Sequence, residues 1–220
     1  MDTNTNTNTA PSTVQVMVER QAFIDQLTMV SRHAAKRVNL PMLEQVWFEV
    51  EQGQVVVAAT DRYTLGVGRL VLAEVDGPTE TRRFGVTVDG VKMLIAGVKR
   101  TPRHFTNIPV AINESTVTVG WDEDAVTAHM TSVTDYPPFR KLIPSDLGAR
   151  DVGPMDRGFN LDYLARMGKS PKSWGAAVIR LNENHTKPAM VTYRECDDFV
   201  ALIMPQRTND LAPYAAPEWL

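Results

Sequence analysis

The 220-residue chain lacks several features on which whole classes of protein depend. It has a single cysteine, Cys196, so it cannot build a disulfide framework, and a lone thiol is typical of a reducing compartment. No apolar run approaches the ~20 residues that a membrane-spanning helix needs. The amino terminus, MDTNTNTNTAPST, has neither the basic start nor the apolar core of a signal peptide. These absences predict an intracellular, cytoplasmic protein with no membrane partner.

Groups that an enzyme would need are also missing. The sequence has no Gly-rich phosphate loop ending in Lys-Ser/Thr, no G-x-G-x-x-G and no G-x-S-x-G. Its four histidines are scattered without the spacing of metal ligands. Acidic runs at 122–124 and 197–198 are typical of solvated hairpin tips, and Asp61 follows a strand, where its side chain is expected to stabilise a turn. We therefore expect no catalytic residue, no metal and no cofactor.

The charge of the chain is unevenly distributed. The formal net charge is -3, from 23 basic and 26 acidic residues. The segments 20–37, 89–104 and 162–172, which we expect to be helical, contain 11 of the basic residues and only three acidic ones, a local +8 that leaves -11 on the remainder. Such segregation suits a protein with one surface that meets phosphates, although solvated helix faces also collect Lys and Arg.

A pattern of one strand, one helix and three strands recurs along the chain. In its first copy VQVMV alternates as a strand, and the helix that follows has an apolar stripe. Three strands are then expected near 45–51, 54–60 and 64–72, with Gln52-Gly53 as the turn of a hairpin. The stripe consists of Phe23, Leu27, Val30 and Ala34.

Two further copies of the pattern follow. The second has a strand through Phe84, Val86 and Val88, a helix at 90–98 whose extension Pro102 ends, and strands at 110–113, 117–121 and 125–132. The third has a short strand GFNL, a helix near 163–169 with Asp162 as its N-cap, and strands near 176–182, 189–194 and 198–204. The repetition predicts an α+β fold made of three strand-helix-three-strand units.

Four stretches in a fixed order resemble the bacterial and bacteriophage DNA polymerase III beta sliding clamps. They are LPMLEQVWFEVEQGQVVVAATDRYTLGV from residue 40, DYPPFRKLIP at 135–144, GFNLDYLARM at 158–167, and KPAMVTYRECDDFVALIMPQR at 187–207. The resemblance implies the DNA clamp, or processivity, fold. Because two units make one clamp domain, it implies a shortened form: a full domain at 13–144 and a half domain at 145–207. A disordered tail at 1–12 and a second tail at 208–220 flank them.

The resemblance implies a processivity factor that encircles duplex DNA without sequence specificity and tethers DNA polymerase and other proteins with clamp-binding motifs. The source, bacterial or viral, and the need for a clamp loader stay open. If about twelve helices line the ring and each chain contributes three of them, four chains would close it, so a homotetramer is expected. A rival interpretation is a clamp mimic without a ring, which binds clamp-binding motifs and sequesters or redirects polymerase.

The resemblance also implies two surfaces. The first is a peptide-binding pocket with an adaptable apolar surface and a basic rim; by residue type alone, Leu43, Ile203 and Met204 are equally well core residues. The second is a basic surface that faces DNA. The pocket would consist of Leu43, Thr60, Tyr63, Leu65, Pro137, Lys141, Leu142, Asn160, Tyr163, Ile203, Met204, Pro205 and Arg207. The DNA-facing residues would be Arg32, Lys36, Lys92, Lys99, Arg100 and Arg166.

Two departures from the family bear on the pocket. The family has Gly-His-Arg where this chain has Arg62-Tyr63-Thr64. Family members end soon after the Met-Pro-x-Arg run, whereas TNDLAPYAAPEWL follows it here. With Tyr214, Trp219 and Leu220, this tail is either a cover for the pocket or a disordered end.

Overall fold

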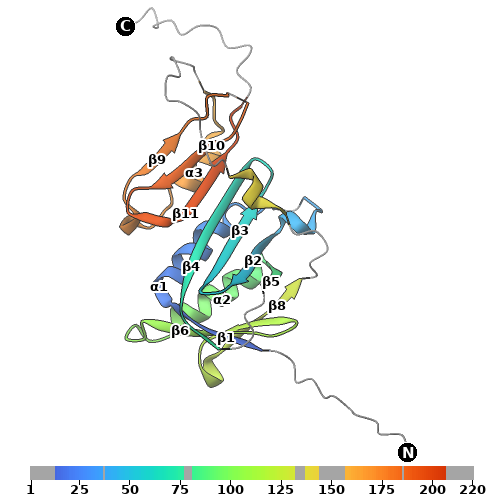
Figure 1. The fold of residues 1–220 in the computed structure, drawn as a ribbon, viewed down its shortest axis with the longest axis vertical. Coiled ribbons are helices and arrows are strands. Elements are labelled where there is room, and N and C mark those ends of the chain that lie inside the picture. The colour runs from blue at the N-terminus through green and yellow to red at the C-terminus, as the bar shows by residue number, and fades with distance from the viewer. Residues whose placement is uncertain are drawn as a thin grey trace, which may run out of the picture.

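The structure is a computed structural model that describes residues 13–36, 38–76, 81–131, 137–143, 157–184 and 186–206. Within these ranges the chain forms three α-helices and eleven strands, so the predicted strand-rich α+β fold is confirmed (Figure 1). The tails predicted at 1–12 and 208–220, and the domain boundary predicted at 144, lie outside the described residues. None of the described helices has the length and apolar character needed to cross a membrane.

The first unit follows its predicted order. It consists of β1 (Val14–Glu19), α1 (Arg20–Ser31), a short 3-10 turn at Pro41–Leu43, β2 (Gln45–Glu51), β3 (Gln54–Thr60) and β4 (Thr64–Asp76). The helix predicted to reach residue 37 ends at Ser31, because the N–H groups of Arg32 and His33 bond to carbonyls three residues back and tighten the last turn. The Ala35 N–H then bonds to the Leu43 carbonyl, so the chain turns toward β2.

The second unit follows its predicted order, with different bounds for its elements. It consists of β5 (Arg82–Thr87), α2 (Val88–Arg100), β6 (Asn107–Ile112), β7 (Thr116–Val119) and β8 (Val126–Thr131). Val88 begins the helix instead of extending the strand, because the Thr87 side chain caps the Gly90 N–H. At the other end Thr101 is extended, as a residue before a proline prefers, so Pro102 stops the helix at Arg100.

The third unit consists of α3 (Leu161–Met167), β9 (Ala177–Arg180), β10 (Ala189–Tyr193) and β11 (Cys196–Ile203). The short strand predicted at GFNL is only a single antiparallel bridge, between Gly158 and Gln206. The predicted N-cap, Asp162, is wrong: the Asn160 side chain accepts a hydrogen bond from the Asp162 N–H at 2.8 Å. Asn serves this role as well as Asp does, and the helix starts two residues earlier than predicted.

One long strand joins the units. The first part of β4, Thr64–Gly68, pairs with β11, and its last part, Leu72–Asp76, pairs with β1 (Figure 1). It is therefore longer than the predicted 64–72. The strand order is β1-β6-β7-β8-β5-β2-β3-β4-β11-β10-β9, and the extra β1–β4 pairing closes the first eight strands on themselves. The third unit thus extends the sheet of the first two.

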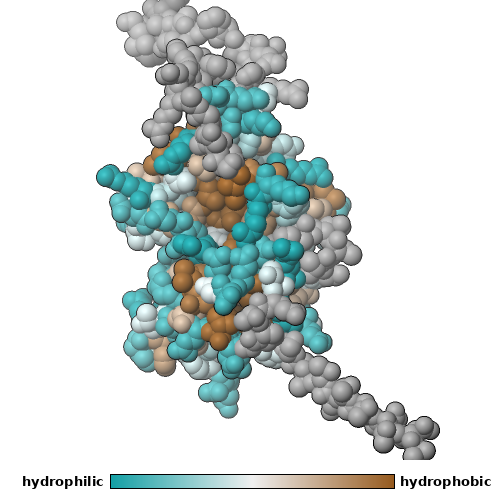
Figure 2. Space-filling model, viewed as in Figure 1, coloured by the Kyte–Doolittle hydropathy of each residue, from teal (hydrophilic) through white to brown (hydrophobic). Residues whose placement is uncertain are grey.

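The core lies on both faces of this sheet. The helix stripe predicted in the first unit is buried, with Phe23, Leu27, Val30 and Ala34 at most 4% exposed, in the main core on the helix side. A smaller core on the other face contains Leu65, Leu202 and Phe139, which begins a 3-10 turn at Phe139–Leu142. Figure 2 shows an apolar area over β10, β11 and the adjoining part of β4.

Candidate peptide and DNA surfaces

The turn between β3 and β4 is held by its own polar side chains. The Asp61 Oδ1 accepts hydrogen bonds from the N–H groups of Tyr63 and Thr64 at 3.0 and 2.7 Å and from the Thr64 hydroxyl at 3.0 Å. The Thr60 hydroxyl donates to the Thr64 carbonyl at 2.7 Å. The turn-stabilising role predicted for Asp61 is therefore confirmed.

Arg62 has an unusual backbone conformation at the tip of this turn. Its φ is +77°, in the left-handed region that favours glycine. The resemblance places a glycine at this position, so the turn keeps the geometry that glycine would provide although the residue has changed. The Thr60 hydroxyl accepts a hydrogen bond from the Arg62 N–H at 3.1 Å, which helps to hold that geometry.

Helix α3 packs its polar side against the same turn. The Arg166 guanidinium donates to the Asp61 Oδ2 at 2.5 Å and to the Thr64 hydroxyl at 3.0 Å. It also lies over the Tyr163 ring, 4.8 Å from its centroid. The Tyr63 and Tyr163 rings stack with centroids 5.8 Å apart. Desolvation by burial, followed by the Asp61 carboxylate, raises the pKa of Tyr163. The third unit is thus joined to the first by an ion pair and an aromatic pair.

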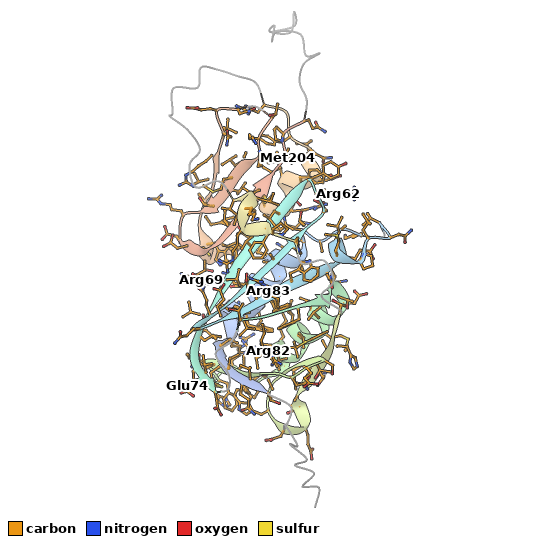
Figure 3. All side chains as sticks on the ribbon, turned by 45° about the vertical axis from the view of Figure 1, so that its right-hand side comes forward. Arg62, Arg69, Glu74, Arg82, Arg83 and Met204 are labelled. Atoms are coloured by element: carbon orange, nitrogen blue, oxygen red, sulfur yellow. The ribbon has the colours of Figure 1, made fainter. Side chains whose placement is uncertain are left out.

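The β4–β11 ladder brings the other end of the chain to this turn. Leu65 pairs with Leu202 and Thr64 with Ile203, and the Met204 N–H donates to the Tyr63 carbonyl at 2.9 Å. Figure 3 shows Arg62 and Met204 near each other at this end of the sheet. Residues about 140 positions apart in the sequence are therefore neighbours, as the resemblance implies.

The residues predicted for the peptide pocket differ in accessibility. Four are buried: Leu43, Leu65, Pro137 and Ile203. Lys141, Tyr63 and Leu142 are exposed, the last two at 57% and 53%. Thr60, Asn160, Tyr163, Met204 and Pro205 are half-buried, and Arg207 lies outside the described residues. Only the exposed and half-buried members have surface that a ligand could contact directly.

A cavity of about 640 Å³ contains residues from both predicted surfaces. Tyr63 and Tyr163 line it, together with Asp61, Asp162 and five basic residues. The basic residues come from the ends of α1 and α3 and from the start of α2; they are Arg32, Lys36, Lys92, Arg166 and Lys169. Four of the six residues predicted to face DNA are therefore close to one another and to the tyrosine pair.

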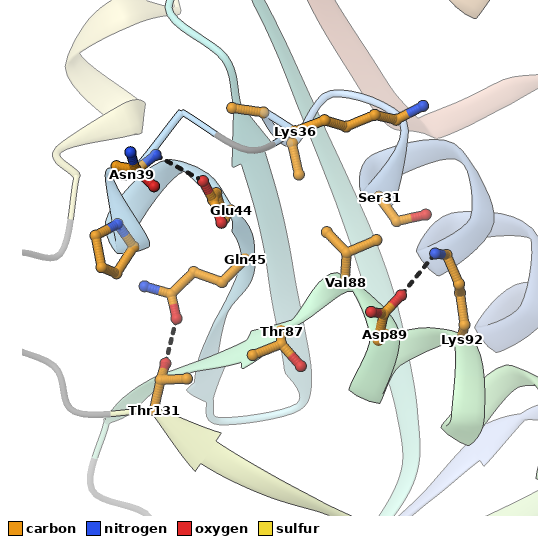
Figure 4. A pocket seen from close by; sticks show the side chains of 13 residues that line it. Ser31, Lys36, Asn39, Glu44, Gln45, Thr87, Val88, Asp89, Lys92 and Thr131 are labelled. Carbon is orange, nitrogen blue, oxygen red and sulfur yellow. Dashed lines mark hydrogen bonds and ion pairs between the residues drawn. The ribbon is translucent and has the colours of Figure 1, made fainter.

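A second cavity, of about 1110 Å³, adjoins the first (Figure 4). Lys36 and Lys92 line both cavities. The Lys92 ammonium bonds to Asp89 at 2.7 Å, which holds the pKa of that carboxyl below its ordinary value. The remaining predicted DNA-facing residues lie elsewhere: Lys99 lines a separate cavity with Arg20, and Arg100 is exposed at the end of α2.

The local charge of +8 predicted for the helices is wrong, because the helices are shorter than predicted. The three helices carry five basic residues, Arg20, Lys92, Lys99, Arg100 and Arg166, and three acidic residues, Asp25, Asp89 and Asp162, a net +2. The other basic residues of the predicted segments follow the helix ends. The positive charge therefore depends on the segments after the helices as much as on the helices themselves.

The connector that carries Lys141 and Leu142 is tied to β2. Arg140 bonds to Glu49 at 3.1 Å and to Glu51 at 2.6 Å, and Arg83 bonds to Glu49 at 2.6 Å. Glu49 is only 2% exposed. Desolvation raises the pKa of its carboxyl, but the hydrogen bonds from Arg83 and Arg140 outweigh this and hold the pKa below its ordinary value. These pairs fix the connector on the face of the sheet opposite the helices.

Sequence reasoning missed a buried polar group beside the site. His33 is 0% exposed and packs against Gly66, and within the described residues neither ring nitrogen has a hydrogen-bond partner. Desolvation, then the positive charge of Arg166, lowers the pKa of His33 to about 3, while Asp61 opposes the shift. Gly66 and Gly68, which alternate on one face of β4, were a usable signal, because such glycines often leave room for a neighbouring side chain.

Comparisons with known proteins agree with this architecture. The family model of the DNA polymerase III beta subunit, N-terminal domain, matches residues 14–140. The DNA polymerase sliding clamp of Bacillus subtilis superposes with a TM-score of 0.70 at 14% identity, over 88% of this chain and 64% of that one. The beta chain of Streptococcus pneumoniae DNA polymerase III superposes with a TM-score of 0.69 at 16% identity, over 88% of this chain and 65% of that one. The pol III beta of Caulobacter crescentus superposes with a TM-score of 0.68 at 15% identity, over 88% of this chain and 65% of that one.

The chain thus spans slightly less than two thirds of the length of these clamps. Curated protein sequences gave no match. The family model covers more than half of the residues, and the solved clamps share the fold over most of the chain. The chain therefore belongs to the DNA polymerase III beta subunit family, the bacterial beta sliding clamps.

Proposed function

We propose that this protein is a processivity factor, a non-enzymatic clamp that encircles duplex DNA as a homo-oligomeric ring and tethers DNA polymerase. The observation that carries the proposal is the continuous sheet formed by β4 and β11, with α1, α2 and α3 on one of its faces. A ring built this way has strands outside and helices toward DNA. It holds DNA by topology, so its contacts with phosphates can be loose and independent of sequence.

The basic residues support this orientation. Arg32, Lys36 and Lys92 lie on the helix side of the sheet, around the cavity of about 640 Å³. Lys99 and Arg100 extend the positive surface along the last turn of α2. Arg166 contributes less, because Asp61 compensates its charge and its side chain is 27% exposed. With three helices in the described part of each chain and about twelve in a closed ring, four chains would complete it.

Tethering would use the surface around the β3–β4 turn. Tyr63 and Tyr163 offer a stacked aromatic surface, and Met204 and Pro205 lie half-buried beside it. Leu142 and Lys141 on the connector add an apolar and a basic group. An extended peptide with an apolar side chain and an acidic residue fits this chemistry. The division into a clamp domain at 13–144 and a half domain at 145–207 is part of the same proposal.

Retention on circular DNA tests the ring. The protein is assembled at high concentration on a closed plasmid and washed in salt that removes electrostatic binding, and the plasmid is then cut once. A ring stays on the circle and is lost from the linear DNA. Changing Lys36, Lys92 and Lys99 to Glu should abolish assembly on DNA, whereas changing the exposed Lys187 and Arg194 to Glu should not. Loss from both DNA forms, with and without a clamp loader, would contradict the ring.

Peptide binding tests the tether separately. A fluorescent peptide that carries a clamp-binding motif is titrated with the wild-type protein and with Tyr63→Ala. Because Tyr63 is 57% exposed, the variant should fold normally and lose about 10-fold or more in affinity. Val71→Ala, at a residue of 58% exposure on β4, is the matched control and should bind as the wild type does. Equal affinity of the two variants would place peptide binding elsewhere.

One observation favours the rival function, a clamp mimic without a ring that sequesters or redirects polymerase. The helices have a net charge of only +2, which is less than a DNA-lined hole would be expected to have. A mimic would bind the peptide with the same Tyr63 dependence but would fail to remain on circular DNA under any condition. The two experiments together therefore separate the functions.

A further inference from the structure

The first two units show how this fold completes a domain. The first strand of each unit pairs with the second strand of the other, so that β1 pairs with β6 and β5 with β2. Each first strand also pairs with the last strand of its own unit, β1 with β4 and β5 with β8. Helices α1 and α2 pack against each other beneath these strands. The two units are thus related by an approximate two-fold axis.

The third unit has only part of this pairing. The bridge between Gly158 and Gln206 corresponds to the pairing of a first strand with the last strand of its own unit. Among the described strands, β9 pairs with β10 alone. Neither the outer edge of β9 nor that of residues 157–160 has a partner strand in the described part of the chain. These are the two edges through which the first two units join.

Side chains in the third unit are exposed where their equivalents are buried. In β2 every residue but the last is buried, whereas all four residues of β9 are exposed. The fourth residue of each helix shows the same difference. Phe23 in α1 and Val91 in α2 are at most 2% exposed, whereas Leu164 in α3 is only half-buried. The first residue of α3, Leu161, is 79% exposed.

We infer that the third unit pairs with the third unit of a second copy of this chain and so completes a clamp domain between subunits. In this arrangement β9 of each copy pairs with residues 157–160 of the other, as β2 pairs with β5 and β6 with β1. Ile179 pairs with Val191 of β10 and so faces the core side of the sheet, where Phe159 also packs. Both side chains then lie in one shared core.

A second copy fits these edges better than another partner does. An exposed edge strand is a site where other chains add strands, and proteins normally cover it. The edge offered by β9 is complementary to residues 157–160 of the same chain, so a two-fold arrangement satisfies both edges at once. The inference deepens the proposed ring by assigning one of its interfaces, and it rests on that proposed function only for the number of subunits.

Solution mass with matched variants tests the interface. The full 220-residue chain is run by light scattering on a sizing column across a concentration series. Ile179→Lys and Leu161→Glu place charges in the inferred interface, at residues 44% and 79% exposed. Val75→Lys and Met93→Glu make the same changes in the first two units, at residues 42% and 54% exposed. We expect both interface variants to weaken assembly by about 10-fold or more, and neither control to do so.

Hydrogen exchange gives a second, independent measurement. The amides of Ala177–Arg180 should exchange more slowly at high protein concentration than at low concentration, and Ile179→Lys should abolish the difference. A monomer at all concentrations, or an assembly that both interface variants leave unchanged, would overturn the inference. The second outcome would leave the proposed ring intact, because plasmid retention would still report it, and would assign the interface elsewhere.

Discussion

His33 makes the stability of this protein depend on pH below about 6.5. Its ring is buried against Gly66, with no hydrogen-bond partner among the described residues, and its pKa falls from 6.5 to about 3. Between these two values the unfolded chain binds a proton that the folded chain does not. The free energy of unfolding is therefore not reduced by His33 above pH 6.5, and it declines as the pH falls from 6.5 toward 3.

The magnitude follows from the shift. One pKa unit corresponds to about 1.4 kcal/mol, so lowering the pH from 7 to 5 should reduce the free energy of unfolding by about 2 kcal/mol through this residue. His33→Leu removes the titrating group and should abolish that part of the pH dependence, whatever its effect on stability at pH 7. His129→Gln, at an exposed histidine on β8, should keep the pH dependence of the wild type.

Urea unfolding followed by circular dichroism at pH 7, 6 and 5 measures these free energies. The comparison uses the change between pH 7 and pH 5 within each variant, so a general loss of stability in His33→Leu does not affect it. If wild type and His33→Leu lost the same free energy over this range, the ring would have to accept a proton in the folded state. The account of an unpartnered buried imidazole would then be wrong.

Three further substitutions have expected effects on the free energy of unfolding, which the same urea assay measures. Glu49→Gln removes the charge of a carboxyl that is 2% exposed and bonded to two arginines, and should lower the free energy of unfolding by about 1–3 kcal/mol at pH 7. This loss should vanish as the pH falls well below 4.5, where Glu49 itself becomes protonated in the wild type. A cost that persisted at low pH would show that packing, not charge, is lost. Gly66→Ala places a methyl group 2.4 Å from the His33 ring and should cost about 1–3 kcal/mol, so an unchanged midpoint would contradict this close packing. Arg62→Gly removes the backbone strain at φ +77° and should stabilise the protein by roughly 0.5–1 kcal/mol, after subtracting the greater conformational entropy that glycine has in the unfolded chain. A loss of stability would mean that contacts of the Arg62 side chain outweigh this strain.

Local sequence determined the order and type of most elements. Alternation placed the β2–β3 hairpin at its observed residues, and the spacing of Phe23, Leu27 and Val30 identified the buried stripe of α1. Asp61 could be assigned to a turn because a short carboxylate after a strand bonds to the next backbone N–H groups. The four ordered stretches that resemble beta clamps identified the family, since agreement along most of the chain is far more specific than any one pattern.

Only the tertiary structure decided features that depend on residues far apart in the sequence. Helix starts shifted because Thr87 and Asn160 supplied caps. The helices also ended before the predicted segments did, at Ser31, Arg100 and Met167, and these early ends reduced the helix charge from +8 to +2. The pairing of β4 with both β1 and β11 came from two partner strands that periodicity cannot reveal. Arg166 was predicted to face DNA, yet it bonds to Asp61, 105 residues away, because folding places α3 against the β3–β4 turn. Sequence patterns report the neighbours of a residue along the chain, whereas burial and ion pairing depend on its neighbours in space.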